Sequence, residues 1–78
     1  MDVGFDMKEV INSKAFSIME TDHTMYLGEV ADNKPHGNGV LFREKSIFEG
    51  VFHQGHKKKG VERYIDGVYR GDYRGGKR

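Results

Sequence analysis

The sequence predicts a mainly β protein, a meander of stacked antiparallel β-hairpins preceded by one short helix. The first observation is a repeat: the pattern aromatic-x-Gly-x-apolar-x-x-Gly/Asn starts at Tyr26, at Phe48 and again at Tyr69, with nearly equal intervals between the three starts. The second is the alternation of residues within each repeat, which is typical of strands. The third is composition, since the 78 residues include eleven glycines but only one proline and no cysteine. Most of these glycines recur at fixed places in the repeat, so they build hairpins.

Residues 1–15 are expected to form a separate N-terminal segment with a short helix. Asp6 and Glu9 have the spacing of a capping box, which predicts a helix over residues 7–14. A helix of two turns is marginal alone, so it needs the sheet. We expect it either to dock on the sheet through three apolar side chains, Met7, Val10 and Ile11, or to cap the open end of the sheet.

A strand is predicted over residues 16–19, followed by a turn at residues 21–23. Ile18 precedes Val40 by the same interval that separates Tyr26 from Phe48, which is the length of one repeat. This strand is therefore interpreted as the second half of an earlier repeat.

The hairpin repeats span residues 16–78, with units at about 24–45, 46–66 and 67–78, the last of them truncated. In the first unit we expect a strand at 24–31, a turn at 32–37 and a short strand at 40–42. The second has a strand at 47–53, a charged loop at 54–60 and a strand at 61–65. The third opens with a tight Asp66-Gly67 turn and a strand at 68–74.

A glycine between two aromatic residues has a physical reason in a strand. Residues i−2, i and i+2 share one face, so a glycine leaves a gap that neighbouring rings cover. Rings on successive repeats then pair across the sheet and stabilise it. The spacing predicts two ladders, Tyr26–Phe48–Tyr69 and Val30–Phe52–Tyr73.

Over residues 24–76 the pattern resembles the MORN (membrane occupation and recognition nexus) repeat. The first unit matches it with Tyr26, Gly28 and the element His36-Gly37-Asn38-Gly39, and the second with Phe48, Gly50, Phe52 and Gly55. Val30 and Asn33 replace an aromatic residue and a glycine of that pattern, Lys59 replaces another glycine, and the third unit stops after Gly76. The resemblance implies an elongated, twisted antiparallel sheet and a non-enzymatic role in protein association, scaffolding or contact with acidic phospholipids.

We therefore expect a small interaction module that binds or inhibits a protein partner through the aromatic and glycine face or through a sheet edge. An open meander leaves two unpaired edges, which also favour a homodimer. The candidate partner-binding residues are the aromatic side chains of the repeats: Tyr26, Phe48, Phe52, Tyr69 and Tyr73. Another hypothesis is an accessory protein, such as a phage-encoded inhibitor, that folds fully only on a larger host protein.

The charge distribution supports an alternative function. Residues 1–39 hold three basic and seven acidic residues, whereas residues 40–78 hold ten basic and five acidic ones. The basic half favours binding to acidic phospholipid or nucleic acid, with tyrosines interleaved among the cations. The candidate anion-binding residues are Lys57, Lys58, Lys59, Arg70 and Arg74. A solvated positive face is the simpler interpretation of such a run.

No catalytic site, cofactor site or metal site is predicted. The serines lie in no nucleophile motif, and the carboxylates form no evident pair. His36, His53 and His56 are the only candidate metal ligands, and loop or turn positions explain them. No segment approaches the length of a membrane span, and the N-terminus lacks the pattern of a secretory signal, so a cytoplasmic location is expected.

Overall fold

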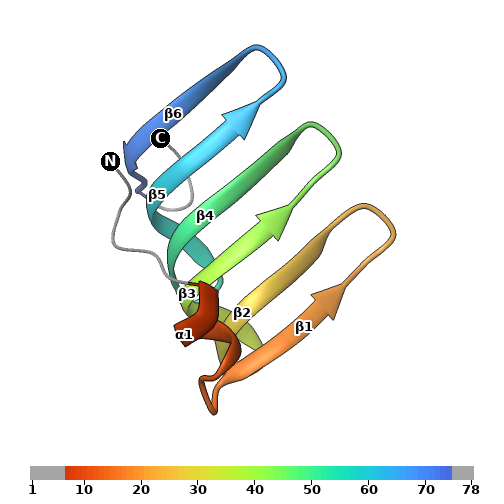
Figure 1. The fold of residues 1–78 in the computed structure, drawn as a ribbon, viewed down its shortest axis with the longest axis vertical. Helices are drawn as coiled ribbons and strands as arrows, with labels where there is room; N and C mark the ends of the chain where they lie inside the picture. Colours follow the sequence, from red (N-terminus) through yellow and green to blue (C-terminus); the bar gives the residue numbers. More distant parts are fainter. Residues whose placement is uncertain (1–6, 75–78) are drawn as a thin grey trace.

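The computed structural model describes residues 7–74. A helix, α1 (Met7–Ile11), precedes six strands that form one antiparallel sheet in chain order. Each strand pairs with the next along the chain (Figure 1), which confirms the predicted hairpin meander. The chain measures 34 × 30 × 23 Å, less elongated than the resemblance implies. The strands are β1 (Phe16–Glu20), β2 (Met25–Ala31), β3 (Lys34–Phe42), β4 (Ser46–His53), β5 (His56–Tyr64) and β6 (Gly67–Asp72).

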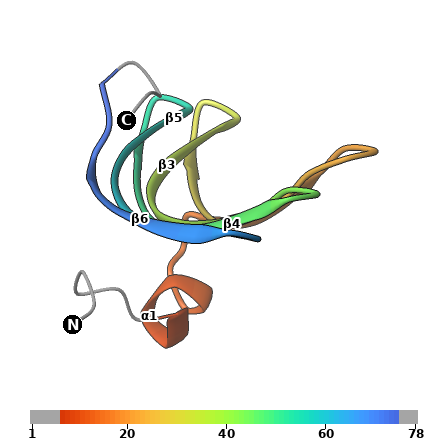
Figure 2. The same ribbon diagram turned by 90° about the horizontal axis from the view of Figure 1, so that it is seen from above.

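The sheet curls, and α1 lies against its outer, convex side (Figure 2). Val10 anchors the helix there, because its side chain is only 2% exposed, whereas Ile11 is 53% exposed. The helix ends at Ile11 and not at residue 14, since Ser13 leaves the helical path and its hydroxyl donates a hydrogen bond to Glu29 Oε2 (2.9 Å). Docking through Val10 is thus confirmed and docking through Ile11 is wrong. Asp6 of the expected capping box lies outside the described residues.

Two of the predicted loops are too long. Asp32 and Asn33, with φ of 52° and 62°, close the β2–β3 hairpin, and Gln54 and Gly55 close the β4–β5 hairpin with φ of 49° and 89°. Both are tight two-residue turns with left-handed backbone at both central positions, which match the twist of the strands. The residues after each turn therefore continue the sheet, so β3 begins at Lys34 and the lysine run lies in β5.

A row of glycines crosses the sheet from β2 to β6. Gly28, Gly39, Gly50, Gly60 and Gly71 are direct neighbours on successive strands. An added Cβ at Gly50 would lie 2.7 Å from the Cα of Gly60, which no side chain tolerates. The row has no side chains of its own, so neighbouring rings can cover it and the sheet can curl there.

The aromatic rings fill the inner face beside this row. Each pair meets edge to face, with ring centroids 5.0 Å apart for Tyr26–Phe52, 5.2 Å for Phe52–Phe48, 5.4 Å for Phe48–Tyr73 and 5.3 Å for Tyr73–Tyr69. The two predicted ladders are therefore wrong in detail: the rings form one zigzag. Rings at equivalent positions stand two strands apart, roughly 10 Å, which is too far for direct contact. Each ring therefore packs against rings of the other predicted ladder.

The third repeat is described as far as Arg74. β6 ends at Asp72, although the N–H of Tyr73 still donates to the carbonyl of Lys58 at 2.7 Å. Gly76 of the repeat pattern lies outside the described residues. At the other end β1 extends the predicted strand by one residue, to Glu20.

Candidate functional site

Four of the five rings assigned to partner binding are core residues. Tyr26, Phe48, Phe52 and Tyr73 are buried, with Phe48 entirely covered. The curl of the sheet packs these rings against one another, so they have no surface for a partner. Tyr69 is the exception, because it is half-buried at the last strand. The repeat pattern placed these residues on one face correctly, and on that face the four buried rings pack against one another as core.

A polar cluster lies within this aromatic core. The carboxylate of Glu62, whose residue is 1% exposed, accepts hydrogen bonds from Lys57 Nζ at 2.9 and 3.1 Å, from the Tyr73 hydroxyl at 2.7 Å and from the Ser46 hydroxyl at 2.9 Å. The ammonium of Lys57 also lies 5.4 Å from the ring centres of Phe48 and Tyr73. The cluster therefore joins β4, β5 and the end of β6.

Electrostatics hold Glu62 in its charged form. Burial alone would raise the pKa of Glu62, but the hydrogen bonds from Lys57, Tyr73 and Ser46 and the lysine charge outweigh it and lower the pKa to about 2. Burial and the neighbouring carboxylate raise the pKa of Tyr73 well above its usual value. The hydroxyl of Tyr73 thus stays protonated and donates to Glu62.

This cluster changes the assignment of Lys57. Lys57 is expected from the sequence to belong to an anion-binding surface, but Glu62 already neutralises its ammonium, and its side chain is only 12% exposed. The repeat could have revealed this, because Glu62 occupies the place in the second unit that Leu41 holds in the first. Leu41 lies on the inner face opposite Tyr26, and Glu62 lies opposite Phe48. A carboxylate at a core position of the repeat requires a partner, and Lys57 is the cation that provides it.

The remaining basic candidates are exposed but not gathered into one site. Lys58 and Arg74 lie near each other, because the N–H of Tyr73 bonds to the carbonyl of Lys58. Lys59 stands across from Asp72 in the pairing register, and Arg70 stands farther along β6 across from Val61. Lys58, Lys59 and Arg74 are thus the anion-binding candidates that the backbone keeps near one another, with the acidic Asp72 between them.

His36, His53 and His56 lie at the turn end of two neighbouring hairpins. The rings of His36 and His53 are 5.0 Å apart, and His56 stands across from His53. His36 Nδ1 accepts a hydrogen bond from the N–H of Gln54 at 3.1 Å, so one ring nitrogen already has a structural role. Among residues 7–74 no group of three metal-ligating side chains comes together.

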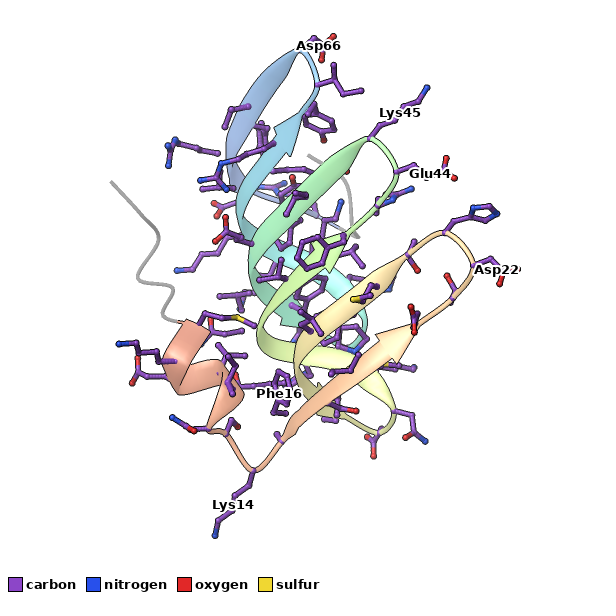
Figure 3. All side chains as sticks on the ribbon, turned by 45° about the vertical axis from the view of Figure 1, so that its right-hand side comes forward. Lys14, Phe16, Asp22, Glu44, Lys45 and Asp66 are labelled. Atoms are coloured by element: carbon purple, nitrogen blue, oxygen red, sulfur yellow. The ribbon has the colours of Figure 1, made fainter. Side chains whose placement is uncertain are left out.

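The opposite end of the sheet presents polar turns. Figure 3 shows Asp22, the pair Glu44 and Lys45, and Asp66 at the tips of three successive hairpins. His23 Nδ1 lies 3.0 Å from Glu44 Oε2, which links two of these turns at an exposed position. Such exposed pairs contribute little stability.

The outer edge of β6 has the features of an incomplete repeat. The hydroxyl of Tyr69 donates to the carbonyl of Asp72 at 2.7 Å, just as the hydroxyl of Tyr26 donates to the carbonyl of Glu29 at 2.6 Å. Both rings are therefore held in the same pose over the glycine two residues ahead of them. Tyr26 is covered by the strand that follows, whereas within residues 7–74 no strand follows β6, and Tyr69 and Gly71 are both half-exposed.

Apolar side chains also remain on the outer face, beyond the area that α1 covers. The pairing register places Met25, Phe42 and Ile47 side by side, with Val68 beyond Arg63 in the same row. Val68 on β6 is 59% exposed. The β6 edge is thus flanked by exposed apolar surface on the outer face and by Tyr69 on the inner face.

No protein-family model matches this sequence, and neither a curated protein nor a solved structure is significantly similar to it. Within the described part of the chain, no helix has the length and apolar character needed to cross a membrane.

Proposed function

We propose that this chain is a non-enzymatic protein-interaction module that receives an extended segment of a partner protein along the outer edge of β6. The observation that carries this proposal is the half-exposed Tyr69 beside the half-exposed Gly71, held as Tyr26 is held in the complete first repeat. The resemblance to MORN repeats agrees with a role in protein association.

The backbone of β6 supports strand addition. The N–H of Tyr73 points to β5, where it bonds to Lys58. Because hydrogen-bonding direction alternates along an antiparallel strand, the N–H and carbonyl of Val68 point away from β5, to the outer edge. A strand edge with outward N–H and carbonyl groups is a template for pairing with another chain.

The flanking side chains add apolar area to such a contact. An added strand would cover Tyr69 on the inner face, and its own apolar side chains would pack beside Val68 on the outer face. Burying this surface contributes about 25 cal/mol for each Å² removed from water. Main-chain hydrogen bonds and burial would therefore act together, as in other complexes formed by strand addition.

The test compares three baits in a pull-down from the source cell at low and moderate salt: the wild-type chain, Val68→Ala and Val68→Pro. Proline removes the N–H that points outward and leaves the pairing with β5, so it blocks the edge and keeps the fold. Alanine keeps the N–H and is the matched control.

We expect the wild-type and alanine baits to retain the same protein partner and the proline bait to lose it, with equal circular dichroism for all three chains. Retention of that partner by Val68→Pro would show that the edge is not the binding site. A wild-type bait that holds no protein at either salt concentration would refute the interaction module itself.

A further inference from the structure

We infer that the strand received by β6 must carry a glycine opposite Gly71, and that Ser17 prevents a second copy of this chain from supplying that strand through β1. The inference rests on the proposed function and adds the chemistry of the partner. It follows from how the aromatic rings and the glycine row fit together.

In each complete repeat, one ring covers two glycines on neighbouring strands. The ring of Tyr26 lies over Gly28 of its own strand and Gly39 of the next: a Cβ added at Gly39 would lie 2.5 Å from both Cε1 and Cζ of Tyr26. In the second repeat Phe48 lies over Gly50 and Gly60, and an added Cβ would stand 2.9 and 2.8 Å from its Cζ. A side chain at the second glycine would therefore collide with the ring.

Tyr69 is already fixed in this pose before any partner binds. Its hydroxyl donates to the carbonyl of Asp72, and an added Cβ at Gly71 would lie 2.9 Å from the hydroxyl oxygen. The ring thus covers the first glycine of its pair and projects where the second belongs. Because the ring is held by its hydrogen bond, an incoming strand with any Cβ at that point must displace it.

A second copy of the chain would otherwise be a suitable partner. β1 runs in the same direction as β3, because both strands are antiparallel to β2. It therefore has the direction of the second strand of a repeat. Its position in the repeat is also correct, because Ser17 and Gly39 both stand across from Gly28, on its two sides. The N-terminal half is acidic and the C-terminal half basic, which would favour head-to-tail pairing of β1 with β6 of another molecule.

Ser17 is the obstacle to that pairing. Within the chain, Ser17 stands across from Gly28 on the side opposite Gly39. The ring that covers Gly28 also covers Gly39, so it leans toward β3 and away from Ser17. If β1 of a second copy paired with β6 in the register of the repeat, the Cβ of Ser17 would lie under the Tyr69 ring. Head-to-tail growth does not close and leads to fibres, so a serine here restricts the edge to a different protein.

The partner segment is therefore extended, pairs antiparallel to β6 and contains glycine with an apolar residue two positions later, which would lie opposite Tyr69. The chain itself supplies such a segment in β3, where Gly39 is followed by Val40 and Leu41. A peptide of residues 36–45 is thus a defined probe for the edge, and the same peptide with alanine at position 39 is its matched control.

Binding of both peptides to the ¹⁵N-labelled wild-type chain would be followed by NMR. We expect the glycine peptide to shift the amide signals of β6 and the alanine peptide to bind at least about tenfold more weakly, since overpacking by one methyl group costs about that much. In a Tyr69→Ala chain the difference between the peptides should vanish. Equal affinity of both peptides for the wild-type chain, or no binding of the glycine peptide at millimolar concentration, would overturn the inference. Neither result would contradict the proposed function, because that function is tested separately by the loss of a captured partner in Val68→Pro.

The role of Ser17 is tested by a gain of association. We expect sedimentation to show that Ser17→Gly forms larger assemblies as its concentration rises, whereas Ser17→Ala and the wild-type chain do not. These assemblies should disappear when Val68→Pro is combined with Ser17→Gly. Growth of the alanine variant to the same extent, or no growth of the glycine variant, would refute the claim that the Cβ of residue 17 blocks the edge.

Discussion

Replacement of Glu62 by glutamine tests the idea that a buried ion pair is built into the aromatic core. Glu62→Gln keeps the size of the side chain but leaves the Lys57 ammonium, 12% exposed, without a counter-ion. Removing one partner of a buried pair costs about 3–5 kcal/mol. We expect the free energy of unfolding, measured with urea at pH 7, to fall by about that amount.

The pKa of Glu62 gives an independent magnitude. It is lowered from 4.5 to about 2, and at about 1.4 kcal/mol for each pKa unit the ionised form contributes about 3 kcal/mol. Because the folded pKa is depressed, this contribution is complete above about pH 4.5 and is lost as the pH falls toward 2. The stability difference between the wild-type chain and Glu62→Gln should therefore shrink steadily across that interval.

Glu49→Gln is the matched control, since Glu49 pairs with Arg63 at an exposed position on the outer face. That change should cost less than about 1 kcal/mol at every pH. The double variant Lys57→Met with Glu62→Leu should cost less stability than Glu62→Gln, because it leaves no buried charge unpaired and removes only the acceptor of the Tyr73 and Ser46 hydroxyls. Equal and small effects of Glu62→Gln and Glu49→Gln, or a difference that does not change with pH, would refute the buried pair.

Two further predictions concern packing. Gly39→Ala should lower the free energy of unfolding by about 1–3 kcal/mol, because its Cβ would strike the Tyr26 ring, whereas Gly67→Ala meets no atom within 4 Å and should change stability little. Val10→Ala should cost about 2 kcal/mol and release the helix, while Ile11→Ala, 53% exposed, should be nearly neutral. Urea unfolding measures each pair, and equal effects within either pair would contradict the assigned packing.

Much of the fold could be predicted because the repeat is local. Tyr26, Phe48 and Tyr69 mark the first strand of each hairpin, and alternation assigns their face. The turn lengths could not be predicted, since Asp32 and Asn33 alone supply the left-handed backbone and the following residues then return to the sheet. Residue types that favour turns do not specify where a turn ends.

The candidate site was harder to predict, because it depends on which side chains neighbouring strands cover. Nothing local distinguishes Tyr69 from Tyr26, since both have the same pattern and the same hydroxyl contact. Their difference in exposure comes from the strand that follows one and not the other within residues 7–74. Position in the sheet, and not residue type, therefore makes β6 the candidate binding edge.

The sequence by itself determined that most of the glycines serve a repeating hairpin, because their recurrence at nearly equal intervals fixes the strand order and the aromatic face. Only the tertiary structure decided that the face curls shut into a core, that Lys57 belongs to Glu62 and that the last ring remains half-exposed. The physical reason is that burial and ion pairing arise between strands, whereas periodicity is a property of each strand alone.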